Sequence, residues 1–121
     1  MGTRSLTIVR DGNEPKSKRI ITMYRQMHGY PSGHGIDLAE FLSEFTIVNG
    51  IGLTDNRKTA NGSGCLAAQI VAHFKTGVGS IYLQAGTDRD KKGAWDESYI
   101  YEVFSDTFDP KAGITMSCYN V

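Results

Sequence analysis

The order of hydrophobic patterns along the chain is the strongest constraint on its fold. Strand-like segments rich in β-branched residues come first, at 4–10 and 19–26. Two segments with helical periodicity follow, and three further strand-like segments lie at 80–84, 98–104 and 114–119. Runs of strands separated from a block of helices are typical of α+β folds. We therefore predict an antiparallel sheet of about five strands with two helices on one face, in the order β-β-α-α-β-β-β.

The two predicted helices differ in how they bury their apolar side chains. In the first, over 36–45, apolar residues recur at i, i+3, i+4 and i+7 from Leu38 to Phe45, which defines one buried face. In the second, over 65–75, apolar residues recur every fourth position with small alanines between them, which indicates a largely buried helix. We expect Ser63 to cap the start of this helix and Gly77 to end it.

These patterns also predict a core and a strand pairing. The first two strands should form an antiparallel hairpin, which places Arg4 near the 24–26 end of its neighbour. Gly86–Asp96 is predicted to be a charged loop. The predicted core residues are Leu6, Ile8, Ile21, Leu38, Phe41, Leu42, Phe45, Leu66, Ile70, Phe74, Ile81, Leu83, Ile100, Val103, Ile114 and Met116.

Composition narrows the class of protein. A chain of 121 residues with 40% hydrophobic residues fits a single domain, 1–121. Thirteen basic residues balance thirteen acidic ones, which argues against bulk nucleic-acid binding through net charge. No apolar stretch approaches the length of about 18 residues that a membrane-spanning helix needs. The start has no apolar leader, so we expect Cys65 and Cys118 to be reduced thiols in a cytoplasmic protein.

A glycine-rich, hydroxyl-bearing loop precedes each predicted helix. The first, within 28–35, holds three glycines and a proline, which predicts neither helix nor strand; the second is 61–64. The first amides of a helix have no internal partners and attract phosphate or carboxylate groups. Arginines at the adjoining strand ends would add charge-assisted bonds, and a tyrosine would stack on a base or ribose. The predicted ligand-binding residues are Arg4, Arg25, Tyr30, Ser32, Gly33, His34, Asn61, Ser63 and Gly64.

A purely structural interpretation of the same residues stays open. Serines and glycines at helix starts are common caps and turns, and Arg25 at a strand end can be a surface or structural charge. Neither a P-loop nor a dinucleotide-binding glycine motif occurs in the sequence. The predicted ligand is therefore a small anion, most simply a nucleotide, without any cofactor.

Catalytic signals are weak. Cys65 lies in the apolar helix, where a buried structural thiol is the simpler interpretation. His28 and His34 lie six residues apart in the first loop without a cysteine or glutamate at zinc-site spacing, so no metal site is predicted. Whether the chain is an enzyme stays open, and these residues favour a binding protein. A small nucleotide hydrolase that uses His28 or His34 is an alternative.

Several motifs resemble a family of small proteins from bacteriophages and prophages. The resemblance rests on the start Met1–Thr7 (MGTRSLT), on the loop Gly29–Gly35 (GYPSGHG), and on the segments 61–67 and 99–103. It covers most of the chain. It implies a phage or prophage origin and one domain, and it implies no activity and no catalytic residues. We expect a location in the host cytoplasm.

By analogy, small phage proteins that hold nucleotides without a catalytic set include sponges, which sequester immune signalling nucleotides of the host. This anti-defence role is our expectation for the chain. Besides the hydrolase, the alternatives are a protein that inhibits a host enzyme through a protein–protein surface and a structural or housekeeping module. Because a chain of this size has little room for a deep pocket, we also expect a homo-oligomer.

Overall fold

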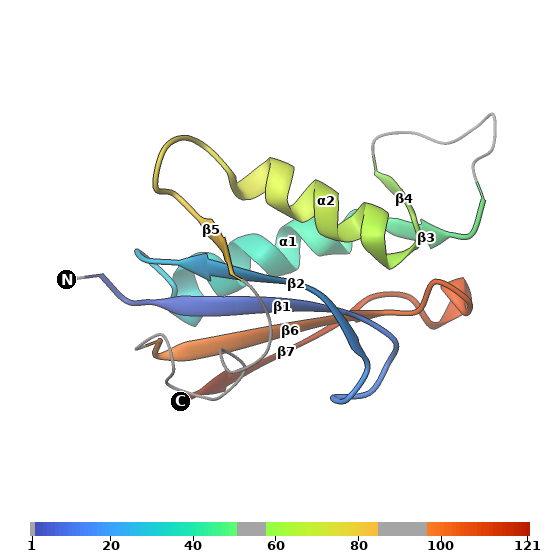
Figure 1. Cartoon of the computed structure of the whole chain (residues 1–121), viewed down its shortest axis with the longest axis horizontal. Coiled ribbons are helices and arrows are strands. Elements are labelled where there is room, and N and C mark those ends of the chain that lie inside the picture. Colours follow the sequence, from blue (N-terminus) through green and yellow to red (C-terminus); the bar gives the residue numbers. More distant parts are fainter. Residues whose placement is uncertain (1, 51–57, 85–96) are drawn as a thin grey trace.

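The computed structural model describes residues 2–50, 58–84 and 97–121, so the predicted loop Gly86–Asp96 lies outside the described residues. The predicted class and element order are confirmed: the fold is α+β, with one five-stranded sheet and two helices (Figure 1). Two short strands are additional. The elements are β1 (Ser5–Asp11), β2 (Lys18–Arg25), η1 (Pro31–Gly35), α1 (Ile36–Ser43), β3 (Thr46–Val48), β4 (Thr59–Asn61), α2 (Gly62–Phe74), β5 (Tyr82–Gln84), β6 (Tyr99–Ser105), η3 (Pro110–Ala112) and β7 (Thr115–Asn120).

The strand order of the main sheet is β5-β2-β1-β6-β7. β1 and β2 pair antiparallel with Ser5 opposite Arg25, which confirms that Arg4 lies near this end of β2. The sheet is mixed rather than wholly antiparallel, because the central strands β1 and β6 are parallel. The long connection through both helices returns the chain to the starting end of β1 before β6 begins, and parallel neighbours require a crossover of this kind.

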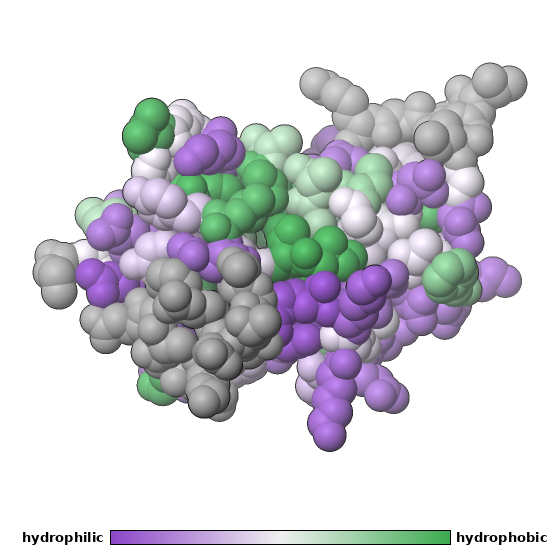
Figure 2. All heavy atoms as spheres, viewed as in Figure 1, coloured by the Kyte–Doolittle hydropathy of each residue, from purple (hydrophilic) through white to green (hydrophobic). Residues whose placement is uncertain are grey.

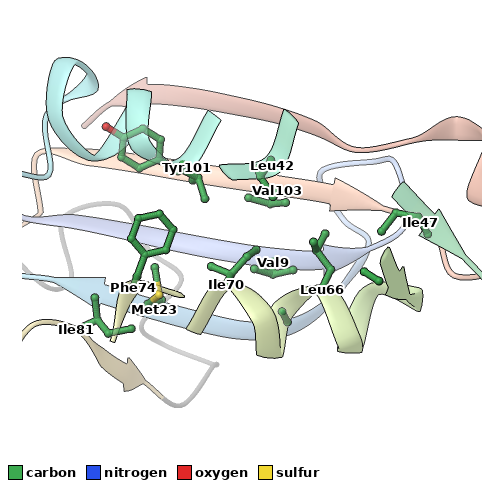
Figure 3. Close-up of a cluster of buried hydrophobic side chains, with 13 residues drawn as sticks. Val9, Met23, Leu42, Ile47, Leu66, Ile70, Phe74, Ile81, Tyr101 and Val103 are labelled. Atoms are coloured by element: carbon green, nitrogen blue, oxygen red, sulfur yellow. The ribbon is translucent and has the colours of Figure 1, made fainter. Parts of the chain in front are cut away.

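Both helices pack on one face of the sheet, as predicted (Figures 1 and 3). α1 contributes Leu38 and Leu42, and α2 contributes an i, i+4, i+8 row from Leu66 to Phe74. These side chains meet Val9 of β1 in the main core. In the space-filling view of the same side, apolar residues gather along α2 and hydrophilic residues border them below (Figure 2). The predicted periodicity of both helices therefore corresponds to real burial.

The core prediction is largely confirmed, with two corrections. Leu6 and Ile8 are buried, but they lie on the sheet face opposite the helices, in a small cluster with Ile100. Strand residues alternate between faces, so the residues of β1 that face the helices are Thr7 and its odd-numbered neighbours. Leu83 is 57% exposed because β5 is a short edge strand. The sequence prediction also missed the buried side chains Val9, Met23 and Tyr101.

Local structure differs from prediction around both helix starts and at one helix end. Pro31–Gly35 is a single π-helical turn that continues directly into α1, so the expected absence of helix there is wrong. α2 begins at Gly62 and ends at Phe74, before the predicted stop at Gly77. In the three described ranges, no helix is long and apolar enough to span a membrane.

Candidate functional site

Arg25 and His34 form a polar cluster at one end of the sheet. Arg25 is the last residue of β2, and its position opposite Ser5 turns its side chain to the helix-bearing face. Its Nε donates to the carbonyl of Met27 at 2.7 Å, and its Nη1 lies 3.1 Å from Nδ1 of His34. Two hydrogen bonds to different partners therefore hold the plane of the guanidinium in one orientation.

The partners of His34 fix its tautomer. A guanidinium only donates hydrogen bonds, so Nδ1 of His34 accepts from Arg25. The ring proton is consequently on Nε2, which donates to Oγ1 of Thr7 on β1 at 3.0 Å. Both ring nitrogens are engaged inside the protein, and the histidine is neutral.

Burial of His34 explains why it stays neutral. The side chain is completely buried, with its ring edge-to-face against Phe74 and Tyr101 at centroid distances of 5.0 and 5.1 Å. Burial, and secondarily the charge of Arg25, lower the pKa of His34 to about 4. The side chain therefore acts as a neutral support for Arg25 and is not accessible to a ligand.

An open groove of about 650 Å³ lies beside this cluster, between α1, the end of α2 and the segment before β5. Arg25 is the only one of the nine predicted ligand-binding residues among its described lining residues. The full described lining is Arg25, Met27, His28, Asp37, Glu40, Phe41, Glu44, His73, Phe74, Thr76, Gly79 and Ser80.

Aromatic rings form part of the groove wall. The rings of Phe41 on α1 and His73 on α2 stack at 4.2 Å with an angle of 24° between their planes. Phe74 meets both rings edge-on, at 5.9 and 4.8 Å. Of these three side chains only His73 is exposed, and a flat ring exposed in a groove offers a stacking contact to a planar ligand group.

The charges of the groove are mixed. Asp37, Glu40 and Glu44 line the groove from α1 and the residue that follows it, and Arg25 lines it from the end of β2. Glu44 forms an exposed ion pair with Lys58. No described carboxylate forms an ion pair or hydrogen bond with Arg25, whose side chain bonds to the neutral Met27 carbonyl and to His34. An anionic group is therefore favoured at Arg25, and hydrogen-bond donors are favoured along α1.

The first glycine-rich loop is closed by its own hydrogen bonds. The amides of Gly33 and Gly35 donate to the carbonyl of Tyr30, and the amide of His34 donates to the carbonyl of His28. These three amides are thus not available to an anion, contrary to the prediction. Tyr30 bonds to Nδ1 of His28 through its hydroxyl at 3.2 Å, and Ser32 is exposed on the loop surface.

The second loop lies at the opposite end of the sheet. Ser63 pairs with Ser105 at the end of β6 and with Asp11 at the end of β1, whereas Arg25 adjoins the start of β1. Ser63 is inside the first turn of α2 and is not its cap; instead, its amide donates to Oγ1 of Thr107. Asn61 accepts from the amide of Gly50, and Gly64 is exposed. The nine predicted residues therefore do not converge on one site.

Arg4 also lies outside the groove lining. It precedes β1, and its carbonyl accepts from the amides of Ser98 and Tyr99 at the start of β6. Sequence reasoning missed the contributions of α1 and α2 to the groove. One signal for them exists: Asp37, Glu40 and Glu44 recur at i, i+3 and i+7, a stripe of carboxylates beside the apolar face of the same helix.

The described part of the chain contains no group of three or more histidines, cysteines or carboxylates that could hold a metal ion. No protein-family model matches the chain, and neither the curated proteins nor the solved structures include a match. The geometry of the groove and its supporting residues is therefore the basis for a functional assignment.

Proposed function

We propose that the chain binds a small anionic ligand of nucleotide size in the groove and does not cleave it. The observation that carries this proposal is the oriented guanidinium of Arg25, which lines the groove and is held by a neutral histidine instead of a carboxylate. An arginine fixed in this way retains its full charge and further donors for a ligand phosphate or carboxylate.

The size and the walls of the groove support a nucleotide. Its volume of about 650 Å³ lies within the range of roughly 300–1,000 Å³ that is usual for small-molecule sites. The stacked rings of Phe41 and His73 can receive a base, and the carboxylates of Asp37 and Glu40 can accept hydrogen bonds from ribose hydroxyls or base amino groups. The phosphate would lie at the Arg25 side, away from these carboxylates.

The state of His34 supports binding without cleavage. His34, one of the two predicted bases of the hydrolase alternative, is buried with both nitrogens occupied. A general base must come within hydrogen-bond reach of the proton that it removes. His28 lines the groove, so a hydrolase would depend on this side chain.

The biological role that fits a non-cleaving nucleotide site is sequestration. We propose that the chain acts as a phage anti-defence sponge that holds a host signalling nucleotide in the host cytoplasm. This role rests on the motif resemblance and on the proposed groove, and it requires tight binding with full recovery of the ligand.

The experiment that tests this function is incubation of the protein with a panel of cyclic dinucleotides and ADP-ribose derivatives. The bound fraction is isolated, the protein is denatured by heat, and the released ligand is identified by mass spectrometry. Recovery of an intact ligand supports sequestration. Recovery of an altered ligand indicates a hydrolase, and absence of binding across the panel contradicts the nucleotide proposal in favour of a protein partner.

A further inference from the structure

Among the residues that the structure describes, β7 is an edge strand of the main sheet. It pairs with β6 on one side and is last in the strand order. The ladder is regular from Thr115 to Asn120, without a bulge. Four of its six residues are exposed and the other two are half-buried. Neither a proline nor a charged residue, the usual means of protecting a sheet edge, occurs in this strand.

The hydrogen-bond pattern shows which backbone groups of β7 point outward. The amide of Val121 donates to the carbonyl of Ser98, and the amide of Tyr99 points to β1, where it donates to the carbonyl of Arg4, so Tyr99 and Asn120 form a non-hydrogen-bonded pair. Hydrogen-bonded and non-hydrogen-bonded pairs alternate in an antiparallel ladder. Met116, Cys118 and Asn120 are therefore in non-hydrogen-bonded positions relative to β6, and their amides and carbonyls point away from the sheet.

On the α1 side, the described surroundings of this edge are uncharged, whereas on the other face the Glu102 carboxylate lies opposite Ser117 and is paired with Arg10. A shallow pocket of about 220 Å³ between α1 and β7 is lined, among described residues, by Ala39, Leu42, Ser43, Ile114, Thr115 and Met116. The carboxylates of α1 instead line the groove on its other side. A second copy of the chain approaching this edge meets neutral residues identical to its own, without repulsion between like charges.

We propose that β7 pairs antiparallel with β7 of a second copy across a two-fold axis, which joins the two sheets into one. An antiparallel strand pair is self-complementary, as a symmetric dimer requires. The register with the greatest overlap pairs all three outward-facing residues. Met116 then lies opposite Asn120 of the partner subunit, and Cys118 lies opposite Cys118 of the partner subunit.

This register makes Cys118 a reporter for the interface. Residues of a hydrogen-bonded antiparallel pair have Cα atoms about 5.5 Å apart, which lies within the range of about 4.4–6.8 Å found in disulfides. Cys118 is an exposed free thiol, whereas Cys65 is half-buried in α2. The two Cys118 thiols would lie on the same sheet face and would react with each other or with a short dithiol cross-linker.

The first test is the mass of the intact chain in solution by size exclusion with light scattering. We expect wild type to give a species of at least twice the 13.3 kDa chain mass. Cys118→Pro should lower that mass by removing an outward amide without breaking a bond to β6, and the matched Cys118→Ser should keep it. If Cys118→Pro fails to fold, Asn120→Pro applies the same test at another outward amide. A monomeric wild type, or a mass unchanged in the folded proline variants, overturns the proposal.

The second test is cross-linking in a Cys65→Ser background. Mild oxidation or a short dithiol reagent should link two copies through Cys118. The control moves the thiol by one residue, as Cys65→Ser/Ser117→Cys/Cys118→Ser, where diagonal cross-strand neighbours are about 7–8 Å apart and disulfides do not form readily. Equal cross-linking of both variants contradicts the register. Both tests are independent of ligand binding, so they can fail while the proposed function holds.

Discussion

Nη1 of Arg25 lies 3.1 Å from Nδ1 of His34, and this contact links a buried histidine to the only described arginine of the groove. The contact crosses from the end of β2 to the turn before α1. On the far side of the ring, Oγ1 of Thr7 on the central strand β1 accepts a hydrogen bond from the protonated Nε2 of His34. The sheet therefore sets the orientation of a guanidinium that lines the groove.

Replacement of Arg25 by alanine should weaken binding and leave the fold intact. The variant loses a charge-assisted hydrogen bond worth roughly 1.5–3 kcal/mol, so the Kd of the tightest nucleotide of the panel should rise about ten- to a hundredfold. The measurement is a calorimetric titration of wild type and variant. Lys16→Ala is the control, because it removes one positive charge from the exposed β1–β2 turn at the other end of the hairpin. Equal affinities of all three proteins would exclude Arg25 from the site.

The buried His34 should make stability depend on pH. Its pKa is lowered to about 4 in the folded protein from an ordinary value of 6.5, so the unfolded chain binds a proton that the folded chain does not. The stabilising contribution is complete above about pH 6.5 and is lost as the pH falls through about 4, by up to about 3 kcal/mol.

Urea denaturation at a series of pH values measures this dependence. Carboxylates titrate in the same window, so the comparison is with His34→Gln, which lacks the imidazole and should show a shallower dependence. If the two proteins lose the same free energy of unfolding between neutral pH and pH 4, the assigned state of His34 is wrong.

Local patterns in the sequence were sufficient to predict the elements of the fold. The apolar spacing from Leu38 to Leu42 and from Leu66 to Phe74 encodes helices that bury one side, and it does so without tertiary information. The antiparallel pairing of β1 with β2 could also be predicted, because a short turn joins the two strands. The parallel neighbours β1 and β6 could not be predicted in this way, because residues about 94 positions apart pair only through the packing of the whole domain.

The candidate site was predictable only in part, since its geometry depends on tertiary contacts. Arg25 is a strand-end cation, and such a residue can be selected from sequence. Nothing in a glycine-rich segment indicates that His34 is fully buried between Phe74 and Tyr101. The two glycine-rich loops have similar sequences, yet they lie at opposite ends of the sheet. The hydroxyl of Ser63 bonds to Ser105 and so holds the start of α2 against β6.

Ser63→Ala should destabilise the protein without changing ligand affinity. The buried Oγ of Ser63 lies 2.7 Å from Oγ of Ser105 and 3.1 Å from Oδ1 of Asp11. Its removal leaves these groups short of a partner, at a cost of about 1–3 kcal/mol in the free energy of unfolding. Chemical denaturation measures the loss, with Ser32→Ala as the control at an exposed serine. A higher Kd in a folded Ser63→Ala protein would show that the second loop takes part in ligand binding.

Two glycine-to-alanine substitutions should act in opposite directions. A Cβ on Gly33 would lie 2.8 Å from the carbonyl oxygen of His28 and 2.9 Å from a ring carbon of Tyr30, so the loop beside the groove must shift. We expect Gly33→Ala to lower the free energy of unfolding by about 1–3 kcal/mol.

Gly64→Ala is the matched change in α2. Among described residues, no atom beyond its chain neighbours and the adjacent helix backbone lies within 4 Å of a Cβ at Gly64, and alanine is the better helix former, so this variant should gain about 0.5–1 kcal/mol. Because the carbonyl of His28 also accepts from the amide of His34, Gly33→Ala should disturb the support of Arg25 and weaken ligand binding, whereas Gly64→Ala should leave it unchanged. Thermal and urea unfolding measure the two stabilities, and calorimetric titration measures the two affinities. Changes of the same sign in stability would show that the close packing of Gly33 against His28 and Tyr30 does not restrain this loop.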